Sequence, residues 1–363
     1  MKVIIVYASA GAGHKTAAEA IYNYLKEYRR DIQAELVDIL DKSDNFFKAS
    51  YRWGYFVLIN YAPALWALSF WITYCRFLRP LTRALASFLN SLNTYEFAKF
   101  LADENPDCII STHFLSSEIS ARLKKKQKIS SKVITAITDF GVHPFWLAAG
   151  TDLYIAASDF TKEILIKEGI EDKAIKVLGI PVNTKFLQVF DKPKLQDRFN
   201  LDRNKFTVLV AIGSFGLGPI EQITDTLQEE AQVLVVCAKN KKLFEALKRK
   251  NYPSLRVFGF IDNIQELMAV SDVIITKPGG LSIAESLVMG LLPVFIVPIP
   301  GQETENIKVL AKYGLGLQAK DVSQIKEHII YLRGHPDKLK DIKVAIEKVK
   351  KPSAVKDICD AIC

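Results

Sequence analysis

Short continuous runs of Val, Ile and Leu, separated by helical patterns, constrain the fold of this chain more than any other feature of its sequence. Unbroken apolar runs joined by helices are typical of parallel sheets that are covered on both faces. The expected strands of the first half are 3–8, 34–37, 108–111, 133–138 and 153–157. Those of the second half are 207–212, 232–237, 255–258, 273–276 and 294–297. The pattern predicts an α/β protein of two tandem, Rossmann-like, doubly wound domains, with an interdomain ligand cleft at the carboxyl ends of the strands.

The length of the chain agrees with two domains, since 363 residues exceed the usual size of about 100–200 residues for one domain. A polar stretch at 185–200 separates the two series of strands. We therefore expect an N-terminal domain over 1–185, with an aromatic insertion at 45–95. A C-terminal domain over 200–335 and a helical tail over 336–363 complete the expected organisation.

Composition excludes several classes of protein. A chain that is 49% hydrophobic and 24% charged is not disordered. The five cysteines show no paired spacing, which argues against a zinc cluster and favours a reducing cytoplasm. The net charge is +8, but residues 45–95 hold five Lys or Arg and no acidic residue, so the remainder is nearly neutral. This distribution argues against a nucleic-acid partner.

The stretch 53–75 has 23 residues without a charge, and eight of them are aromatic. Its length would permit a transmembrane helix. However, Pro63 interrupts it, and a single crossing inside the first α/β domain would separate the strands of one sheet. We therefore expect monotopic contact with a membrane surface, and the alternatives are a hairpin of core helices or a dimer interface. The expected membrane contacts are Trp53, Trp66 and Trp71 in the headgroup region, with Arg76, Arg79 and Arg83 facing anionic lipid.

A small-residue loop, Gly11-Ala12-Gly13-His14, follows the first expected strand and opens a helix. It matches neither a Walker A loop nor GxGxxG, because the required glycines are missing. Free N–H groups at a helix start favour an anion or a polarised hydroxyl. His14 is the unusual residue, since a neutral imidazole there could take a proton from an attacking alcohol. The alternative is a structural histidine that caps the helix.

Polar and aromatic side chains also end two other strands of the first half. The segment 138–146 contains Asp139, His143 and Trp146, and this combination suits a polar head beside an apolar tail. We expect Asp139 to orient His14 or to contact the acceptor. His113 ends another strand in the same way. For both His113 and His143, a purely structural role is the competing interpretation.

Four motifs follow strands of the second half in a fixed order. A glycine-rich turn begins at Gly213-Ser214, and a turn at 257–261 could read a base edge through exposed backbone groups. Next, Gly279 and Gly280 open a helix that suits a diphosphate, while Glu285 could accept bonds from a ribose diol. Finally, the loop 298–306 carries an amide and a carboxylate that suit the hydroxyls of a sugar.

This order of motifs resembles the donor site of GT-B glycosyltransferases of family 28, and within them monogalactosyldiacylglycerol synthases and processive diacylglycerol glucosyltransferases. The resemblance covers roughly residues 1–320, and 257–309 is its most specific part. It implies an inverting, metal-independent transfer of a hexose from UDP-galactose or UDP-glucose to diacylglycerol. The sequence has no Asp-x-Asp motif, in agreement with metal independence. No cofactor is expected besides the UDP-sugar as co-substrate.

The resemblance also implies roles for single residues. The implied donor-binding residues are Gly213, Ser214, Phe260, Ile261, Gly279, Gly280, Leu281, Ser282, Glu285, Gln302, Glu303 and Asn306. The implied catalytic pair is His14 and Asp139, and the implied acceptor-binding residues are Gly13, His113, His143 and Trp146. The implied partners are UDP-hexose, diacylglycerol and anionic membrane lipids, at the cytoplasmic face of the cell membrane. The resemblance makes 1–185 the acceptor and membrane-binding domain and 200–335 the UDP-sugar-binding domain.

Three other functions remain compatible with these motifs. One is N-acetylglucosamine transfer from its UDP-sugar to a lipid-linked cell-wall precursor, which shares the donor site. Another is a non-hydrolysing UDP-sugar epimerase with the same two-domain fold. The third is a membrane-surface regulator that only senses the UDP-sugar. The motifs do not distinguish galactose from glucose, because these sugars differ at a single stereocentre.

Overall fold

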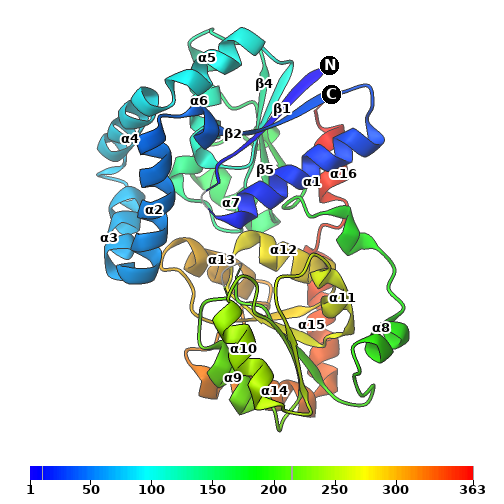
Figure 1. Cartoon of the computed structure of the whole chain (residues 1–363). Helices are drawn as coiled ribbons and strands as arrows, with labels where there is room; N and C mark the ends of the chain where they lie inside the picture. The colour runs from blue at the N-terminus through cyan, green and yellow to red at the C-terminus, as the bar shows by residue number, and fades with distance from the viewer. Residues whose placement is uncertain (10, 214–215, 363) are drawn as a thin grey trace. The chain divides into compact units, whose positions relative to one another are not determined.

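The chain forms two α/β units, and the computed structural model describes residues 1–9, 11–213 and 216–362. The first unit comprises Met1–Thr184, Ile299–Asn306 and Lys351–Cys363, and the second comprises Lys185–Pro298 and Ile307–Lys350. This division differs from the expected one, because 336–363 is not a separate tail. Helix α16 (Ala354–Asp360) packs on α1 (Ala12–Tyr28) in the first unit, where Ile358 and Cys359 are buried. The two helices lie side by side in Figure 1.

The first unit contains a six-stranded parallel sheet in the order β2-β1-β3-β4-β5-β6. Its strands are β1 (Lys2–Tyr7), β2 (Gln33–Asp38), β3 (Cys108–Ser111), β4 (Lys132–Ala136), β5 (Leu153–Ala156) and β6 (Ile175–Val177). Its other helices are α2 (Asn45–Tyr61), α3 (Pro63–Tyr74), α4 (Arg79–Asn93), α5 (Tyr95–Glu104), α6 (Phe114–Lys125) and α7 (Asp159–Lys167). The five strands expected in this half are confirmed, and the short edge strand β6 was not expected.

Helices cover both faces of this sheet, which explains why its strands are continuously apolar. Val3 and Ile5 of β1 pack in one cluster with α1 and α16. Ile4 and Val6 pack in another with α5 and α6. The strand order reverses between β1 and β3, and ligands of doubly wound sheets bind at such a reversal, beyond the carboxyl ends of the strands.

The second unit contains a five-stranded parallel sheet in the order β11-β10-β7-β8-β9, which reverses between β7 and β10. Its strands are β7 (Thr207–Val210), β8 (Gln232–Val236), β9 (Leu255–Phe258), β10 (Val273–Thr276) and β11 (Leu292–Phe295). Its helices are α8 (Lys192–Arg198), α9 (Ile220–Leu227), α10 (Lys241–Lys250), α11 (Ile264–Val270), α12 (Gly280–Val288), α14 (Val322–Gly334) and α15 (Pro336–Val349). Helix α13 (Gln302–Ala311) begins in the first unit, and its residues from Ile307 onward group with the second.

The aromatic insertion lies in the connection between β2 and β3 and forms α2, α3 and α4. The uncharged stretch 53–75 is not one helix, because Pro63 begins α3 at a position where its missing N–H costs no hydrogen bond. Neither α3 nor α4 has a fully buried residue. Among the described residues, we find no helix that combines the length and apolar character needed to cross a bilayer.

Helix α4 turns its apolar side chains outward. Leu81, Leu85, Phe88 and Leu92 recur at helical spacing and are all exposed. Its polar side chains Ser87 and Asn90 instead hydrogen-bond to Glu118 of α6. The exposed apolar side chains of the insertion, called here the apolar set, are Phe46, Trp53, Val57, Tyr61, Leu65, Leu68, Trp71, Tyr74, Phe77, Leu81, Leu85, Phe88, Leu89 and Leu92.

Candidate active site

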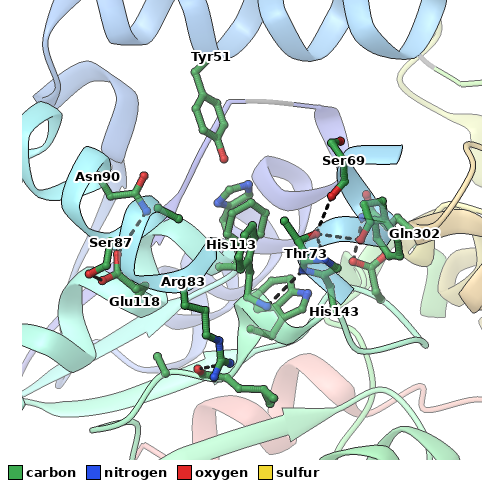
Figure 2. Close-up of a pocket in the computed structure, with 18 of the residues that line it drawn as sticks. Tyr51, Ser69, Thr73, Arg83, Ser87, Asn90, His113, Glu118, His143 and Gln302 are labelled. Carbon is green, nitrogen blue, oxygen red and sulfur yellow. Dashed lines mark hydrogen bonds between the residues drawn. The ribbon is translucent and has the colours of Figure 1, made fainter. Parts of the chain in front are cut away.

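A cavity of about 740 Å³ lies within the first unit, beneath the insertion. Most of its accessible lining is apolar and includes Leu58, Phe70 and Phe114, and His14 is one of the polar groups in its wall. Figure 2 shows Ser87, Asn90 and Glu118 grouped on one side of this pocket and Thr73, His143 and Gln302 on the other. An apolar pocket with a few convergent polar groups is the usual form of a small-molecule site.

The backbone carbonyl of Thr112 fixes the imidazole of His14. Strand β1 leads through Gly11, whose φ is 98°, into the first turn of α1, where Gly13 and His14 are both half-buried. The Nδ1 atom of His14 lies 2.8 Å from the Thr112 carbonyl oxygen and 2.8 Å from Thr138 Oγ1. A carbonyl oxygen can only accept, so Nδ1 carries the proton and donates it. The other nitrogen, Nε2, is therefore the one with a lone pair.

Burial lowers the pKa of His14 below 6.5, while the charge of Asp139 and the bond to the Thr112 carbonyl oppose this shift. The imidazole is consequently neutral at physiological pH. A neutral imidazole with its Nδ1–H held by a carbonyl can accept a proton at Nε2. This is the chemistry that the site can perform on a bound hydroxyl.

Asp139 is buried and holds three side chains together. Its two carboxylate oxygens accept hydrogen bonds from Gln302 Nε2 at 2.9 Å and from Asn306 Nδ2 at 3.2 Å. Burial raises the pKa of Asp139, whereas the charge of His14 and the hydrogen bonds from Asn306, Gln302 and Trp146 lower it. Asp139 therefore influences His14 through its charge, while Thr112 and Thr138 hold the ring.

Asn306 is held by hydrogen bonds inside the first unit. Its side chain is fully buried, and its carbonyl oxygen accepts from the backbone N–H groups of Phe140 and Gly141 at 2.8 and 3.0 Å. With its amide bonded inside the protein, Asn306 positions the loop after β4, and its contact with the sugar stays a prediction. Glu303 is also buried and accepts a hydrogen bond from the Ile299 N–H at 2.7 Å.

His113 and His143 both act as N-caps. Nδ1 of His113 accepts from the Leu115 N–H at 3.1 Å, and burial with the charge of His14 holds the pKa of His113 well below 6.5. Nδ1 of His143 accepts from the Phe145 N–H at 3.2 Å. Burial and the charges of Arg79 and Arg83 lower the pKa of His143 to about 3. Both histidines are neutral, and both line the cavity with Trp146.

The donor candidates of the second unit lie beyond the carboxyl ends of its strands. Gly213 follows β7 and Gly279 follows β10, the two strands at which the order reverses. Gly279 is the N-cap of α12, and Gly280, Leu281 and Ser282 form its first turn. Ser214 lies outside the described residues. This arrangement places free backbone N–H groups at the reversal point of the sheet, which suits a diphosphate.

Glu285 stands on α12, one turn beyond these residues. Burial raises the pKa of Glu285 to about 7, against the opposing charge of Lys185. Its carboxyl group is thus poised to change charge near neutrality. Phe260 and Ile261 follow β9, and the Phe260 side chain is exposed.

Three of the six expected membrane contacts point inward. Trp66 donates from Nε1 to the Pro300 carbonyl at 3.1 Å. Arg79 forms an ion pair with Glu168, and Arg83 donates to the carbonyls of Pro144 and Leu147. The acceptors of Arg79 and Arg83 lie inside the first unit, and no sequence pattern reveals them. Trp53, Trp71 and Arg76 do point outward, with Arg76 79% exposed.

Sequence reasoning missed one polar cluster of the cavity wall. Glu118 and Arg122 on α6 form an ion pair at 3.3 Å, and both bind Ser87 of α4. The spacing of four residues between Glu118 and Arg122 was the available signal. Among the described residues, no group of three or more His, Cys, Asp or Glu side chains is placed to hold a metal ion.

Two family models match the chain. The model of monogalactosyldiacylglycerol (MGDG) synthase matches residues 14–182, and that of the glycosyltransferase family 28 C-terminal domain matches residues 207–358. A similar curated protein is the processive diacylglycerol beta-glucosyltransferase of Bacillus cereus (strain G9842). It is 28% identical over 368 residues, which cover 99% of this chain and 93% of that protein.

Solved structures share the fold. MurG of Acinetobacter baumannii aligns with a TM-score of 0.62 at 15% identity, over 99% of both chains. The UDP-GlcNAc 2-epimerase of Neisseria meningitidis aligns with a TM-score of 0.58 at 14% identity, also over 99% of both chains. At identities of 15% and 14%, these matches over nearly the whole chain support the architecture alone. The first half of the chain thus matches the monogalactosyldiacylglycerol synthase model and the second half the family 28 C-terminal domain model, and the protein is a UDP-sugar-dependent glycosyltransferase that is similar to diacylglycerol glycosyltransferases.

Proposed function

We propose that this enzyme transfers a hexose from a UDP-sugar to the free hydroxyl of diacylglycerol and forms a β-glycosyldiacylglycerol. The observation that carries the proposal is His14, whose Nδ1–H is held by the Thr112 carbonyl at the wall of an apolar cavity. A lipid alcohol needs an apolar site for its chains and a base for its hydroxyl. The name of the B. cereus relative supports diacylglycerol as the acceptor, in preference to a cell-wall precursor or an epimerisation.

In the proposed reaction, the lipid hydroxyl attacks C1 of the hexose while His14 Nε2 takes its proton. The bond from C1 to the diphosphate oxygen breaks, UDP leaves, and the configuration at C1 inverts. The N–H groups at the start of α12 stabilise the charge that develops on the diphosphate, so that no metal ion is needed. Phe260 and Ile261 are proposed to hold uracil, while Glu285 binds the ribose.

The roles proposed for the remaining residues combine the resemblance with their contacts. Gln302 and Glu303 are proposed, from the resemblance, to bind the hexose hydroxyls, and of these two residues only Gln302 lines the cavity. Asp139 is a positioning residue for Gln302 and tunes the pKa of His14 by its charge. His113, His143 and Trp146 shape the wall of the acceptor cavity.

We also propose that the apolar set binds the cytoplasmic face of the cell membrane. Soluble monomers rarely expose so many large apolar side chains together. The insertion carries no acidic residue between positions 45 and 95, and Arg76, which precedes the exposed Phe77, is 79% exposed and lies 3.9 Å from Glu168. An apolar surface without acidic residues of its own and with an exposed arginine is complementary to a bilayer that contains anionic lipid.

A direct assay tests the activity. Purified protein is mixed with liposomes of diacylglycerol and an anionic lipid, EDTA, and either UDP-galactose or UDP-glucose. We expect a glycosyldiacylglycerol with at least one of the two donors, since neither binding nor leaving-group departure requires a cation. Absence of product with both donors, despite liposome binding, would contradict diacylglycerol as the acceptor.

Replacing Leu85 and Phe88 together by Glu should weaken liposome binding at least about tenfold, because two outward apolar side chains become charged. Flotation with anionic liposomes measures this binding. Val344→Glu on α15 also charges an exposed apolar position, but in the second unit, and should leave flotation unchanged. If the double variant floats normally and instead converts a dimer to a monomer, the apolar set is a dimer interface.

His14→Ala should lower kcat by about 10²–10⁴, the usual contribution of a general base. Because burial holds the pKa of His14 below 6.5, the acidic limb of kcat, measured at saturating UDP-hexose, should also lie below pH 6.5 for the wild-type enzyme. His328→Ala, which changes a histidine of α14 outside the cavity, is the matched control and should retain activity. A His14→Ala enzyme with more than half of the wild-type activity would remove His14 from this role.

The affinity for UDP should fall as the pH is lowered through about 7, where Glu285 becomes protonated. A ribose diol donates to a carboxylate, and protonation removes these charge-assisted hydrogen bonds. Glu285→Gln should bind UDP about ten- to hundredfold more weakly at alkaline pH and lose the pH dependence. Titration calorimetry at several pH values measures both effects, with Glu221→Gln as a surface control in the same unit. A wild-type affinity that stays constant across neutral pH would reject the ribose assignment.

A further inference from the structure

Apart from Ser69 and Thr73, helix α3 consists of apolar and aromatic residues on all its sides, yet none of its residues is fully buried. Such a helix normally lies in a core. Its exposed side chains Leu65, Leu68 and Trp71 belong to the apolar set, and Trp71 is 63% exposed. Its other side carries Trp66, Phe70 and Thr73, which line the cavity. The helix therefore has two separate apolar contacts to make.

The inner side of α3 is fitted to the backbone of the segment 299–302. The Trp66 indole N–H donates to the Pro300 carbonyl at 3.1 Å. The ring of Phe70 lies so close to Gly301 that a Cβ atom there would come within 2.4 Å of it. Gly301 also has a φ of 90°, so only glycine combines this backbone conformation with this contact. Helix α3 thus packs directly against the backbone of the segment 299–302.

This segment leads directly to the polar groups of the site. Gln302 is the next residue after Gly301, and its Nε2 donates to Asp139 at 2.9 Å. A second contact connects α3 with the loop after β4, because Thr73 Oγ1 lies 3.0 Å from His143 Nε2. The Phe70 and His143 rings are 4.6 Å apart. One helix therefore contacts both chain segments that meet at Asp139.

We propose that Trp66 and Phe70 are positioning residues through which contact of α3 with a bilayer strengthens the binding of the UDP-hexose. This inference rests on the proposed function, since it takes the apolar set as the membrane surface and Gln302 as a hexose contact. A bilayer that holds Leu65, Leu68 and Trp71 restricts the motion of α3, and with it the segment 299–302. Gln302 is then already ordered before the donor binds. Donor binding no longer includes the entropy cost of ordering this side chain, so the donor affinity rises.

The coupling is reciprocal, which makes it measurable without any transfer. If vesicles raise the affinity for the UDP-hexose, the UDP-hexose must raise the affinity for vesicles by the same factor. Vesicles of phosphatidylcholine and phosphatidylglycerol without diacylglycerol exclude the reaction with the acceptor. The dissociation constant of the UDP-hexose is then compared between free and vesicle-bound protein. UDP alone is the matched ligand, because it lacks the hexose that Gln302 would contact.

For the wild-type protein, we expect vesicles to tighten UDP-hexose binding by about fivefold or more and to leave UDP binding unchanged. Trp66→Phe keeps the apolar ring and removes the hydrogen bond to the Pro300 carbonyl. It should still bind vesicles and should lose most of the coupling. Trp71→Phe makes the same substitution on the outer side of α3. It should weaken vesicle binding and keep the coupling factor at saturating vesicle concentration.

Circular dichroism checks that each variant is folded, and Phe70→Leu replaces Trp66→Phe if the latter is not. Phe70→Leu removes the ring that lies on Gly301 and should also lose the coupling. The inference is wrong if the wild-type UDP-hexose affinity does not depend on vesicles, or if the coupling survives in the folded inner-side variants. Transfer to diacylglycerol is measured separately. Glycolipid formation without coupling between vesicle binding and UDP-hexose binding rejects this inference alone. Coupling without glycolipid formation rejects diacylglycerol as the acceptor.

Discussion

The buried carboxylate of Asp139 is the interaction on which the candidate site depends. It accepts hydrogen bonds from Gln302, Asn306 and Trp146, and Asn306 in turn accepts from the backbone after β4. Removing one partner of such a buried cluster leaves the other polar groups unsatisfied, at a cost of about 1–3 kcal/mol for each group. One charge therefore fixes the loop after β4, the start of α13 and the position of Gln302. The same charge moderates the effect of burial on the pKa of His14.

The insertion directs its polar and apolar side chains in the opposite way from the sheet that carries it. In the strands of the first unit, apolar side chains face inward on both faces and form the core. In α4, the polar residues Ser87 and Asn90 face inward toward Glu118, while the leucines face outward. Periodicity in the sequence reveals a stripe of this kind but not the direction in which it points. The composition was more informative, since the absence of acidic residues over 45–95 separates this surface from an ordinary core.

Much of the fold could be predicted from the sequence, because continuous apolar runs and glycine-rich strand ends are local signals. His14 was found in the same way, as an unusual side chain at the carboxyl end of β1. The groups that define its chemistry were not, because Nδ1 is held by a backbone carbonyl at Thr112, about a hundred residues away. Likewise, Gln302 reaches Asp139 across 163 residues, and its pairing depends on the tertiary fold. Arg79 and Arg83 look like surface cations in the sequence, but their acceptors lie on other elements.

The two titratable groups assigned to the chemistry are shifted in opposite directions by the same cause. Burial lowers the pKa of His14, since the charged form of an imidazole is the cation. Burial raises the pKa of Glu285 to about 7, since the charged form of a carboxyl group is the anion. The His14 imidazole is thus already neutral throughout the neutral pH range, whereas the Glu285 carboxyl group becomes mostly ionised only on the alkaline side. With the roles proposed for them, donor binding and not the base would set the lower pH limit of activity at subsaturating UDP-hexose.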